Sequence, residues 1–327
     1  MGEIRENALI ERIDRRSGRR PGTLLGIGDD AAVLAVGDRA VVTCDLLVEG
    51  VHFRRSTTGM ADLGHKAAAV NLSDLAAMGA RPVALIVGLA IPPGLDSASI
   101  DALYDGIDGM AARAGATVAG GDVSAAPALV LAVTAVGRLA PGSEAATRSG
   151  GRPGDLLCVT GALGASAAGL ALLERPDAAA GVPQADALRA AHLRPEPRVE
   201  AGMLLSRGGA TALMDVSDGL VLDAGRLARA SGLRARIDLD ALPVAPGVAA
   251  VAAALGAHPR ALAATGGEDY ELLAAVPPGR LDALRAALAP LDLTVVGALE
   301  EGDGAPRVVD GDGAAVTLPA PGWEHDV

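Results

Sequence analysis

Residues 61–91 read ADLGHKAAAVNLSDLAAMGARPVALIVGLAI, and this stretch sets the architecture of the first half of the chain. Its alanine-rich part predicts a long helix over 61–79. The following PVALIVGLAI (82–91) is a continuous apolar run closed by Pro92 and Pro93, which is typical of a buried strand. A helix that leads directly into a buried strand indicates a unit in which helices cover a sheet.

Strands and helices alternate on both sides of this stretch. Further strands are expected over 40–48, 116–124, 128–138, 234–239, 270–276 and 293–298, and strands that lead into turns over 155–161 and 211–220. Further helices are expected over 3–14, 98–114, 163–174, 198–206, 247–255 and 279–289 and from the turn after 220 to about 231, with a loop over 175–186. The stretch 137–154 is rich in Gly, Pro and Ser, so we expect two domains, 1–140 and 141–327. Strands and helices mixed in this way in both halves predict two domains, each of the α/β or the α+β class.

The composition limits the classes of protein to consider. At about 150 residues per domain, 327 residues suggest roughly two domains, and half of the residues are apolar. Lys and Arg number 28 against 40 Asp and Glu, which gives a formal net charge of −12. This charge argues against a nucleic acid or an anionic membrane as partner, because phosphate backbones attract a basic face. A small phosphorylated ligand remains compatible if metal ions shield its charge.

The cysteines and the first residues indicate the compartment. Cys44 and Cys158 are the only cysteines and form no CxxC motif, so neither a disulfide framework nor a thiolate zinc site is expected. The N-terminus is charged from Glu3 onward and has no apolar signal-peptide core. We therefore expect a protein of the reducing cytoplasm.

The main chemical signal is a set of aspartates at the ends of apolar strands or in glycine turns. They are Asp29 and Asp30 in GIGDD, Asp45 in VTCDLL, Asp74 in NLSDLAAMGA, Asp122 in AGGDVS, and Asp215 and Asp218 in MDVSDG. A buried carboxylate is costly unless a cation compensates it, and Lys66 is the only lysine of the chain. Oxygen ligands favour Mg²⁺. The alternative is that these aspartates only form turns and helix caps.

Other residues indicate an anionic ligand without fixing it. Glycines such as Gly120 and Gly121 allow backbone N–H groups to approach a phosphate, yet there is no GxxxxGK[ST] motif, so a P-loop enzyme is excluded. No histidine pair has zinc spacing, and His192 is isolated. Trp323 lies in a polar tail, where it either stacks on a ligand or anchors a lid.

In seven ordered segments the chain resembles the thiamine-monophosphate kinase family. The segments are GIGDDAAVL, TCDLLVEGVHF, KAAAVNLSDLAAMGA, AGGDVS, TRSGGRPGD, MDVSDGL and GGEDYEL. The resemblance covers about residues 24–275 and extends to the tail. It implies the two-domain fold of aminoimidazole-ribonucleotide synthetase, with an N-terminal α/β domain that dimerises through its sheet. A C-terminal α+β domain would complete the nucleotide and substrate site.

The same resemblance assigns roles to individual residues. Magnesium ligation is implied for Asp30, Thr43, Cys44, Asp45, Asp74, Asp122, Asp215 and Asp218. ATP contacts are implied for Tyr104, Gly121, Asp122, Arg148 and Ser217, and substrate contacts for His52, Glu268 and Trp323. The family usually has a hydroxyl residue where this chain has Cys44, so Cys44 ligates through its backbone carbonyl or not at all.

The implied reaction converts ATP and thiamine monophosphate into ADP and thiamine diphosphate by in-line transfer assisted by several Mg²⁺ ions. The nucleophile is a phosphate oxygen, which needs no strong general base. Two alternatives remain open at this point: another ATP-dependent synthetase of the same superfamily, and a non-catalytic protein that binds divalent metals or polyphosphate.

Overall fold

The structure is a computed structural model that divides into two compact units. It describes residues 13, 15, 23–25, 33–179 and 181–323. The first unit comprises residues 1–75 and 80–143, and the second comprises 76–79 and 144–327. The division after residue 143 lies inside the stretch 137–154 that is rich in Gly, Pro and Ser. The expected helix over 3–14 falls almost entirely outside the described residues.

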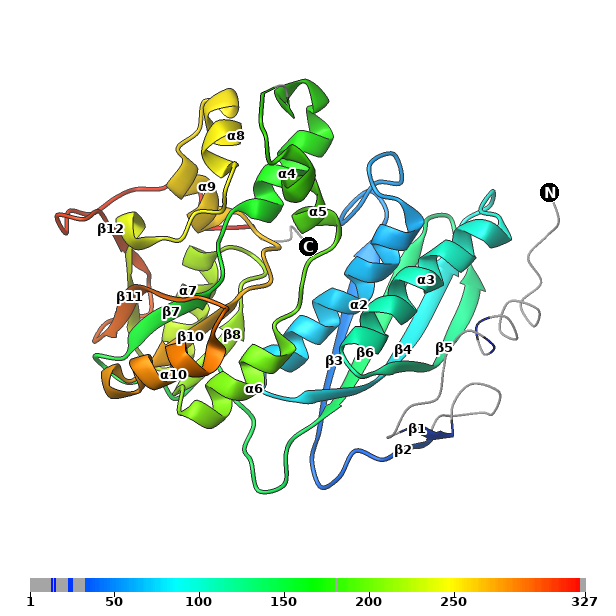
Figure 1. Cartoon of the computed structure of the whole chain (residues 1–327), viewed down its shortest axis with the longest axis horizontal. Helices are drawn as coiled ribbons and strands as arrows, with labels where there is room; N and C mark the ends of the chain where they lie inside the picture. Colours follow the sequence, from blue (N-terminus) through cyan, green and yellow to red (C-terminus); the bar gives the residue numbers. More distant parts are fainter. Residues whose placement is uncertain (1–12, 14, 16–22, 26–32, 180, 324–327) are drawn as a thin grey trace. The chain divides into compact units, whose positions relative to one another are not determined.

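The first unit is a four-stranded sheet with two long helices along one of its faces (Figure 1). Its elements are β1 (Thr23–Leu25), β2 (Val33–Leu34), β3 (Ala40–Val48), α2 (Met60–Ala77), β4 (Arg81–Ile91), α3 (Ser97–Arg113), β5 (Thr117–Ala125) and β6 (Val130–Arg138). The order is β3-β6-β4-β5, in which only β4 and β5 run parallel. The strands β1 and β2 form a separate antiparallel pair.

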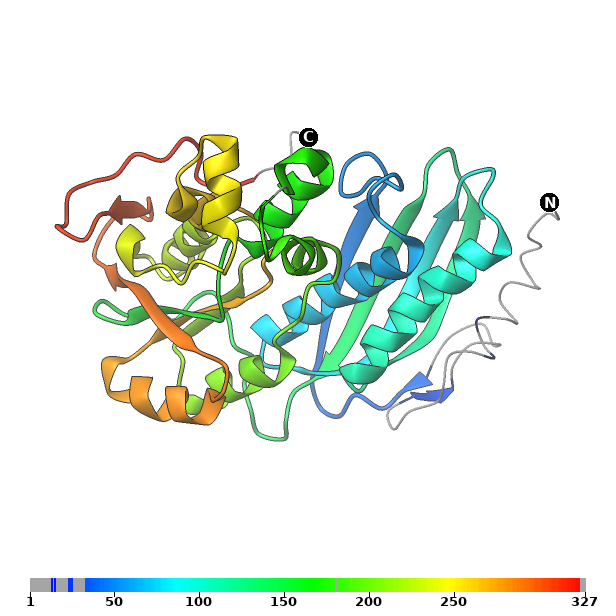
Figure 2. The same ribbon diagram turned by 45° about the horizontal axis from the view of Figure 1, so that its top comes forward.

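Close approach of α2 and α3 depends on two glycines. A Cβ added to Gly64 in α2 would lie 1.9 Å from the carbonyl oxygen of Leu103, and one added to Gly106 in α3 would lie 2.0 Å from that of Ala61. The two backbones therefore touch where a side chain would separate them. Figure 2 shows the two helices side by side on the same face of the sheet.

The second unit has a six-stranded sheet with helices on both faces. Its strands are β7 (Leu156–Thr160), β8 (Ala212–Asp215), β9 (Arg234–Asp238), β10 (Leu272–Val276), β11 (Leu293–Glu300) and β12 (Arg307–Val309). Its α-helices are α4 (Ala165–Glu174), α5 (Ala185–Leu193), α6 (Val199–Gly208), α7 (Leu220–Ala230), α8 (Val248–Leu255), α9 (Pro259–Thr265) and α10 (Leu281–Leu288). Short 3-10 turns are η1 (Pro176–Ala179), η2 (Leu239–Ala241) and η3 (Pro278–Arg280). The order is β12-β9-β11-β7-β10-β8, and only β12 with β9 is parallel.

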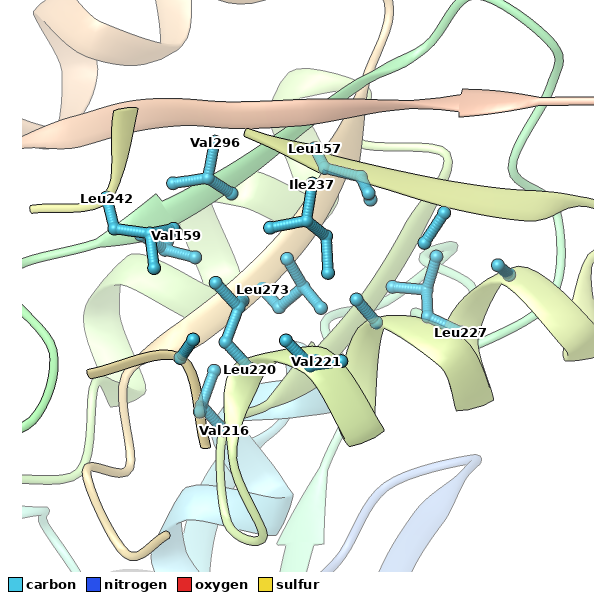
Figure 3. Close-up of a cluster of buried hydrophobic side chains, with 14 of the residues drawn as sticks. Leu157, Val159, Val216, Leu220, Val221, Leu227, Ile237, Leu242, Leu273 and Val296 are labelled. Atoms are coloured by element: carbon cyan, nitrogen blue, oxygen red, sulfur yellow. The ribbon is translucent and has the colours of Figure 1, made fainter. Parts of the chain in front are cut away.

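Side-chain alternation along the central strands builds two cores. Leu157 and Val159 of β7 pack in a cluster with α7 and α9 (Figure 3), whereas Cys158 packs on the opposite face with α6 and α10. Leu273 in β10 belongs to the first cluster and Leu272 to the second. Because both faces are covered, these strands are apolar at successive positions rather than at alternate ones.

The fold class is confirmed as an α/β unit followed by an α+β unit, with some elements beyond those expected. The sequence did not indicate α5, α9 or β12, and the expected loop over 175–186 contains η1. In the described part of the chain no single helix has the length and apolar character to cross a membrane; only the bent pair of α8 and α9 meets that test when taken together.

The glycine contact between α2 and α3 gives a stability prediction. Gly106→Ala places a methyl group against the Ala61 carbonyl, so we expect the free energy of unfolding to fall by about 2–4 kcal/mol. Gly109→Ala in the same helix meets no atom within 4 Å, and the higher helix propensity of alanine should raise stability by up to about 1 kcal/mol. Urea denaturation of both variants measures the difference, and equal midpoints would contradict the close packing.

Candidate functional site

Two carboxylates lie close together in the first unit. The Thr43 hydroxyl donates to Asp74 Oδ2 at 2.5 Å, and the Asp45 backbone N–H donates to Asn71 Oδ1 at 3.1 Å. This pairs β3 with the middle of α2. Burial, together with the negative charge of Asp74, raises the pKa of Asp45 to about 6. The arrangement places two negative charges side by side in half-buried surroundings.

The strand geometry shows which atom of Cys44 could contribute to a metal site next to Asp45. Thr43 faces α2 through its contact with Asp74. Since side chains alternate along a strand, the thiol of Cys44 points to the opposite face of the sheet, where the residue is exposed. Any ligation by Cys44 next to Asp45 would therefore use the backbone carbonyl.

Asp122 does not join the Asp45–Asp74 pair. Asp45 is on β3 and Asp122 on β5, with β6 and β4 between them, so roughly 14 Å of sheet separates the two strands. Among the described residues, no three His, Cys, Asp or Glu side chains are grouped so that they could hold a metal ion. Asp30 lies outside the described residues.

The remaining predicted residues of the first unit occupy different surroundings. The Val48 backbone N–H donates to His52 Nδ1 at 3.1 Å, so neutral His52 carries its proton on Nε2. Tyr104 is buried in α3 at 3% exposure, where burial and the neighbouring Asp108 raise the pKa of its phenol. A Cβ on Gly121 would lie 2.0 Å from the Val87 carbonyl oxygen, so packing alone requires glycine there.

In the second unit, a buried carboxylate organises the MDVSDGL segment. Asp223 in α7 is fully buried, and its Oδ2 accepts from the backbone N–H groups of Ser217 at 3.1 Å and Asp218 at 3.0 Å. Burial raises the pKa of Asp223 to about 6. Arg226 pairs with Asp223 Oδ1 at 2.9 Å and also with Asp218. Asp223 thus fixes the backbone of the turn, and Arg226 neutralises the two acids.

Three segments that are distant in sequence meet at this turn. The Glu268 backbone N–H donates to the Ser217 backbone carbonyl at 2.7 Å. The Trp323 backbone N–H donates to the Asp218 backbone carbonyl at 2.9 Å. A Cβ on Gly267 would lie 2.7 Å from the Ser217 carbonyl oxygen, which explains the glycine. Asp215 ends β8 beside this turn and is buried. The structure therefore brings together Asp215, Ser217, Asp218, Glu268 and Trp323.

The GGEDYEL segment is held in an unusual backbone conformation. Glu268 and Tyr270 have φ angles of 64° and 51°, which are uncommon for residues with side chains. Between them, Asp269 accepts from the backbone N–H groups of Gly164 at 2.6 Å and Ser166 at 3.1 Å. Removal from water raises the pKa of Asp269 to about 7 despite these donors. Asp269 thereby attaches the segment to the start of α4.

Arg148 lies on an exposed segment beside the edge strand β8. The Leu213 backbone N–H donates to the Thr147 carbonyl at 2.9 Å, and the Ser231 hydroxyl donates to the Arg148 carbonyl at 3.2 Å. The backbone is therefore anchored while the guanidinium extends from the surface.

Four residues of this site were not singled out from the sequence as functional: Asp223, Arg226, Asp269 and His192, whose Nδ1 lies 3.2 Å from Glu268 Oε2. For Asp223 a signal existed, because it is an acid within the apolar face of an amphipathic helix with an arginine three residues later. His192 gave none, since α5 itself was not expected.

The donor atoms suit magnesium in both units. Thr43, Asp45 and Asp74 offer only hard oxygen atoms, and so do Asp215 and Asp218. Mg²⁺ usually binds through one or two carboxylates together with waters and substrate phosphates, so small acidic groups are sufficient. The raised pKa of Asp45 is consistent with a carboxylate that lacks a compensating cation.

The chain matches known proteins over most of its length. Models of the AIR synthase related protein match residues 28–139 for the N-terminal domain and 152–309 for the C-terminal domain. Thiamine-monophosphate kinase of Mycobacterium tuberculosis is 42% identical over 277 residues, covering 83% of this chain and 80% of the relative. The crystal structure of thiamine-monophosphate kinase from Stenotrophomonas maltophilia K279a is 38% identical, with a TM-score of 0.82 and coverages of 94% and 97%. AaThiL complexed with AMPPCP and TMP is 33% identical, with a TM-score of 0.79 and full coverage of both chains, at 100% each.

The raised pKa of Asp45 predicts that the free energy of unfolding depends on pH. A carboxyl whose pKa is raised from 3.8 to about 6 on folding costs no stability below about pH 4; the cost grows between about pH 4 and pH 6 and is fully present above about pH 6. Without divalent metal at pH 8, we expect Asp45→Asn to unfold with about 1–3 kcal/mol more free energy than the wild type. The gain should shrink as pH falls to 5.

Chemical denaturation between pH 5 and pH 8 measures this gain. Asp312→Asn, at an exposed loop position, is the matched control and should change stability little at either pH. An Asp45→Asn protein that is less stable than the wild type at pH 8 would contradict the like-charge account.

Proposed function

We propose that this protein transfers the terminal phosphoryl group of ATP to thiamine monophosphate, because the chain belongs to the thiamine-monophosphate kinase family of AIR synthase related proteins. The observation that carries the proposal is the assembly of Ser217, Asp218, Glu268 and Trp323 around one turn, in a chain that aligns along its full length with AaThiL complexed with AMPPCP and TMP. AMPPCP is an analogue of ATP, so that relative holds both reactants of the proposed reaction.

The residues divide into groups by what they bind. Glu268 offers a carboxylate to the cationic or amino-bearing end of thiamine monophosphate, and Trp323, which is 47% exposed, offers a flat surface to its rings. His52 lies at the end of β3 as a further substrate contact. Arg148 and Ser217 are proposed to contact the nucleotide, and the roles of Tyr104 and Gly121 there stay predictions.

The reaction is an in-line displacement between two phosphates. A phosphate oxygen of thiamine monophosphate attacks the γ-phosphorus of ATP, the bond from that phosphorus to the bridging oxygen breaks, and ADP leaves. The second pKa of a phosphate monoester is about 6, so the nucleophile is already ionised near neutral pH and no side chain has to remove a proton. The task of the protein is to hold two anions together in line.

Several aspartates would hold Mg²⁺ for this purpose. Asp45 and Asp74 with Thr43 would hold one ion, and Asp215 and Asp218, three residues apart at the end of β8, are proposed to hold another. When bound, the metal supplies neutralisation of the repulsion between the two phosphates. Asp122 is too far along the sheet to share an ion with Asp45, which supports more than one metal position. Arg226 pairs with both Asp218 and Asp223, so its positive charge lies between these two carboxylates.

Loss of one proposed ligand should abolish turnover and leave the fold intact. Asp218→Asn removes the charge from the turn, and we expect kcat to fall at least about 100-fold with ATP, Mg²⁺ and thiamine monophosphate. Formation of ADP and thiamine diphosphate is followed by chromatography, and Asp312→Asn is the control. Near-normal turnover in Asp218→Asn would contradict the proposed role.

The same incubation separates the alternatives. A related synthetase would consume ATP only with a different acceptor, and a binding protein would produce neither ADP nor thiamine diphosphate. The cytoplasm is the proposed location, and the two free cysteines suit a reducing compartment.

A homodimer through the first unit is part of the proposal. The sheet face opposite α2 and α3 exposes Val42 at 61% and Leu46 at 54% on β3. In register beside them on β6 lie Val136 and Ala132, which are only partly buried. Such a row of apolar side chains on a sheet face is unfavourable in water. The same face of a second copy is self-complementary and would cover it.

A charge on this face should separate the dimer. For the wild type we expect a mass of about 65 kDa by light scattering, twice the 32.3 kDa of one chain, and for Leu46→Glu the mass of one chain. Leu204→Glu, at a 39% exposed position of α6, is the control and should remain dimeric. A Leu46→Glu protein that keeps the wild-type mass would contradict this interface.

A further inference from the structure

A buried histidine lies directly behind the proposed substrate carboxylate. His192 in α5 is 6% exposed, and its Nδ1 lies 3.2 Å from Glu268 Oε2 and 3.0 Å from Ser166 Oγ. Ser166 belongs to α4 and is itself buried at 1% exposure. Three side chains from three separate segments of the second unit therefore meet at one nitrogen atom.

The chemistry of these groups decides which of them donates the hydrogen bond. An ionised carboxylate only accepts hydrogen bonds, so an attractive contact with Glu268 requires a proton on His192 Nδ1. The Ser166 oxygen lies close enough to share that proton and restricts rotation of the ring. The imidazole thus acts as a fixed donor to one oxygen of the carboxylate.

The backbone of Glu268 is held in an unusual conformation, and the donor acts on the direction of its carboxylate. With φ at 64°, the residue is in a conformation that side chains disfavour, and its backbone is held at Ser217 and, through its neighbour Asp269, at Gly164 and Ser166. These bonds locate the main chain, and the contact with His192 acts on the side chain itself. The Glu268 side chain is 29% exposed, so one part faces His192 and another faces solution.

We propose that His192, held by Ser166, is a positioning residue that aims the Glu268 carboxylate as hydrogen-bond acceptor for the amino-bearing ring of the substrate. This inference rests on the proposed function. A carboxylate with one oxygen occupied by a protein donor presents the other as a directional acceptor, which suits an N–H group. The thiazolium ring carries a positive charge but no N–H donor, so a directional acceptor would bind it less favourably than the amino-bearing ring.

A purely structural role would have different consequences. His192 also lies where α4 and α5 pack, so its replacement is expected to lower thermal stability in either case. Only a positioning role predicts that the effect appears in the binding of one substrate and depends on the presence of Glu268.

The test compares His192→Gln, Glu268→Gln and the double variant with the wild type. Since hydrogen bonds to charged groups are worth roughly a factor of ten or more, we expect His192→Gln to raise KM for thiamine monophosphate about tenfold. KM for ATP and kcat should stay within about twofold. In the double variant the loss should be no greater than in Glu268→Gln alone, because coupled residues are not additive.

A substrate analogue identifies the group that Glu268 accepts from. Oxythiamine monophosphate carries a carbonyl oxygen in place of the amino group. The wild type should prefer thiamine monophosphate over this analogue, and His192→Gln and Glu268→Gln should lose most of that preference. His258→Gln is the matched control, because His258 is exposed at the start of α9 and should keep the wild-type preference.

The outcomes separate this inference from the proposed function. A wild type that forms no thiamine diphosphate would overturn the proposed function and this inference with it. An active wild type would overturn the inference alone if KM for thiamine monophosphate is unchanged in His192→Gln, if the losses add in the double variant, or if the wild type does not prefer the amino compound. If His192→Gln does not fold, Ser166→Ala decides by the same ratio of KM values, with a several-fold rise expected.

Discussion

The arrangement of this protein depends on holding carboxylates close together in partly or fully buried surroundings. Asp45 lies beside Asp74 in the first unit, and Asp218 and Asp223 share Arg226 in the second. Without compensation such carboxylates oppose folding, because each loses hydration and repels its neighbour. Arg226 pairs with Asp218 and Asp223, whereas Thr43 donates to Asp74 and the Asp45 backbone N–H donates to Asn71. Mg²⁺ bound at Asp45 and Asp74 would offset the repulsion between their carboxylates.

In the second unit, the sheet and its backbone hydrogen bonds hold the segments that carry the proposed functional residues. Its sheet is covered on both faces, and the functional segments emerge from it at the end of β8 and before β10. Backbone hydrogen bonds between Ser217 and Glu268, and between Asp218 and Trp323, fix these segments relative to each other. Buried acids such as Asp223 and Asp269 hold the main chain of these segments in place. Strain at Glu268 is tolerated because the bonds on either side determine its conformation.

The sequence predicted the parts of this structure that follow a local pattern. The apolar runs at β3 and β4 and the capped helix α3 were located to within one or two residues, and the aspartates stood out at the ends of such runs. Long-range contacts were not predictable. The distance from Asp45 to Asp122 depends on a strand order in which β6 comes between β3 and β4. The role proposed for His192 depends on α5, whose short, alanine-rich sequence gave no periodic signal, and on a loop 76 residues away, counted from 192 to 268.

Metal positions in the loaded protein test the central claim most directly. A crystal grown with AMPPCP, thiamine monophosphate and Mn²⁺ in place of Mg²⁺ should give anomalous scattering peaks next to the carboxylates of Asp45 and Asp74 and next to those of Asp215 and Asp218. Each peak should also lie within bonding distance of a phosphate oxygen. Bound nucleotide without manganese at these carboxylates, or manganese held only by side chains elsewhere on the surface, would contradict the account.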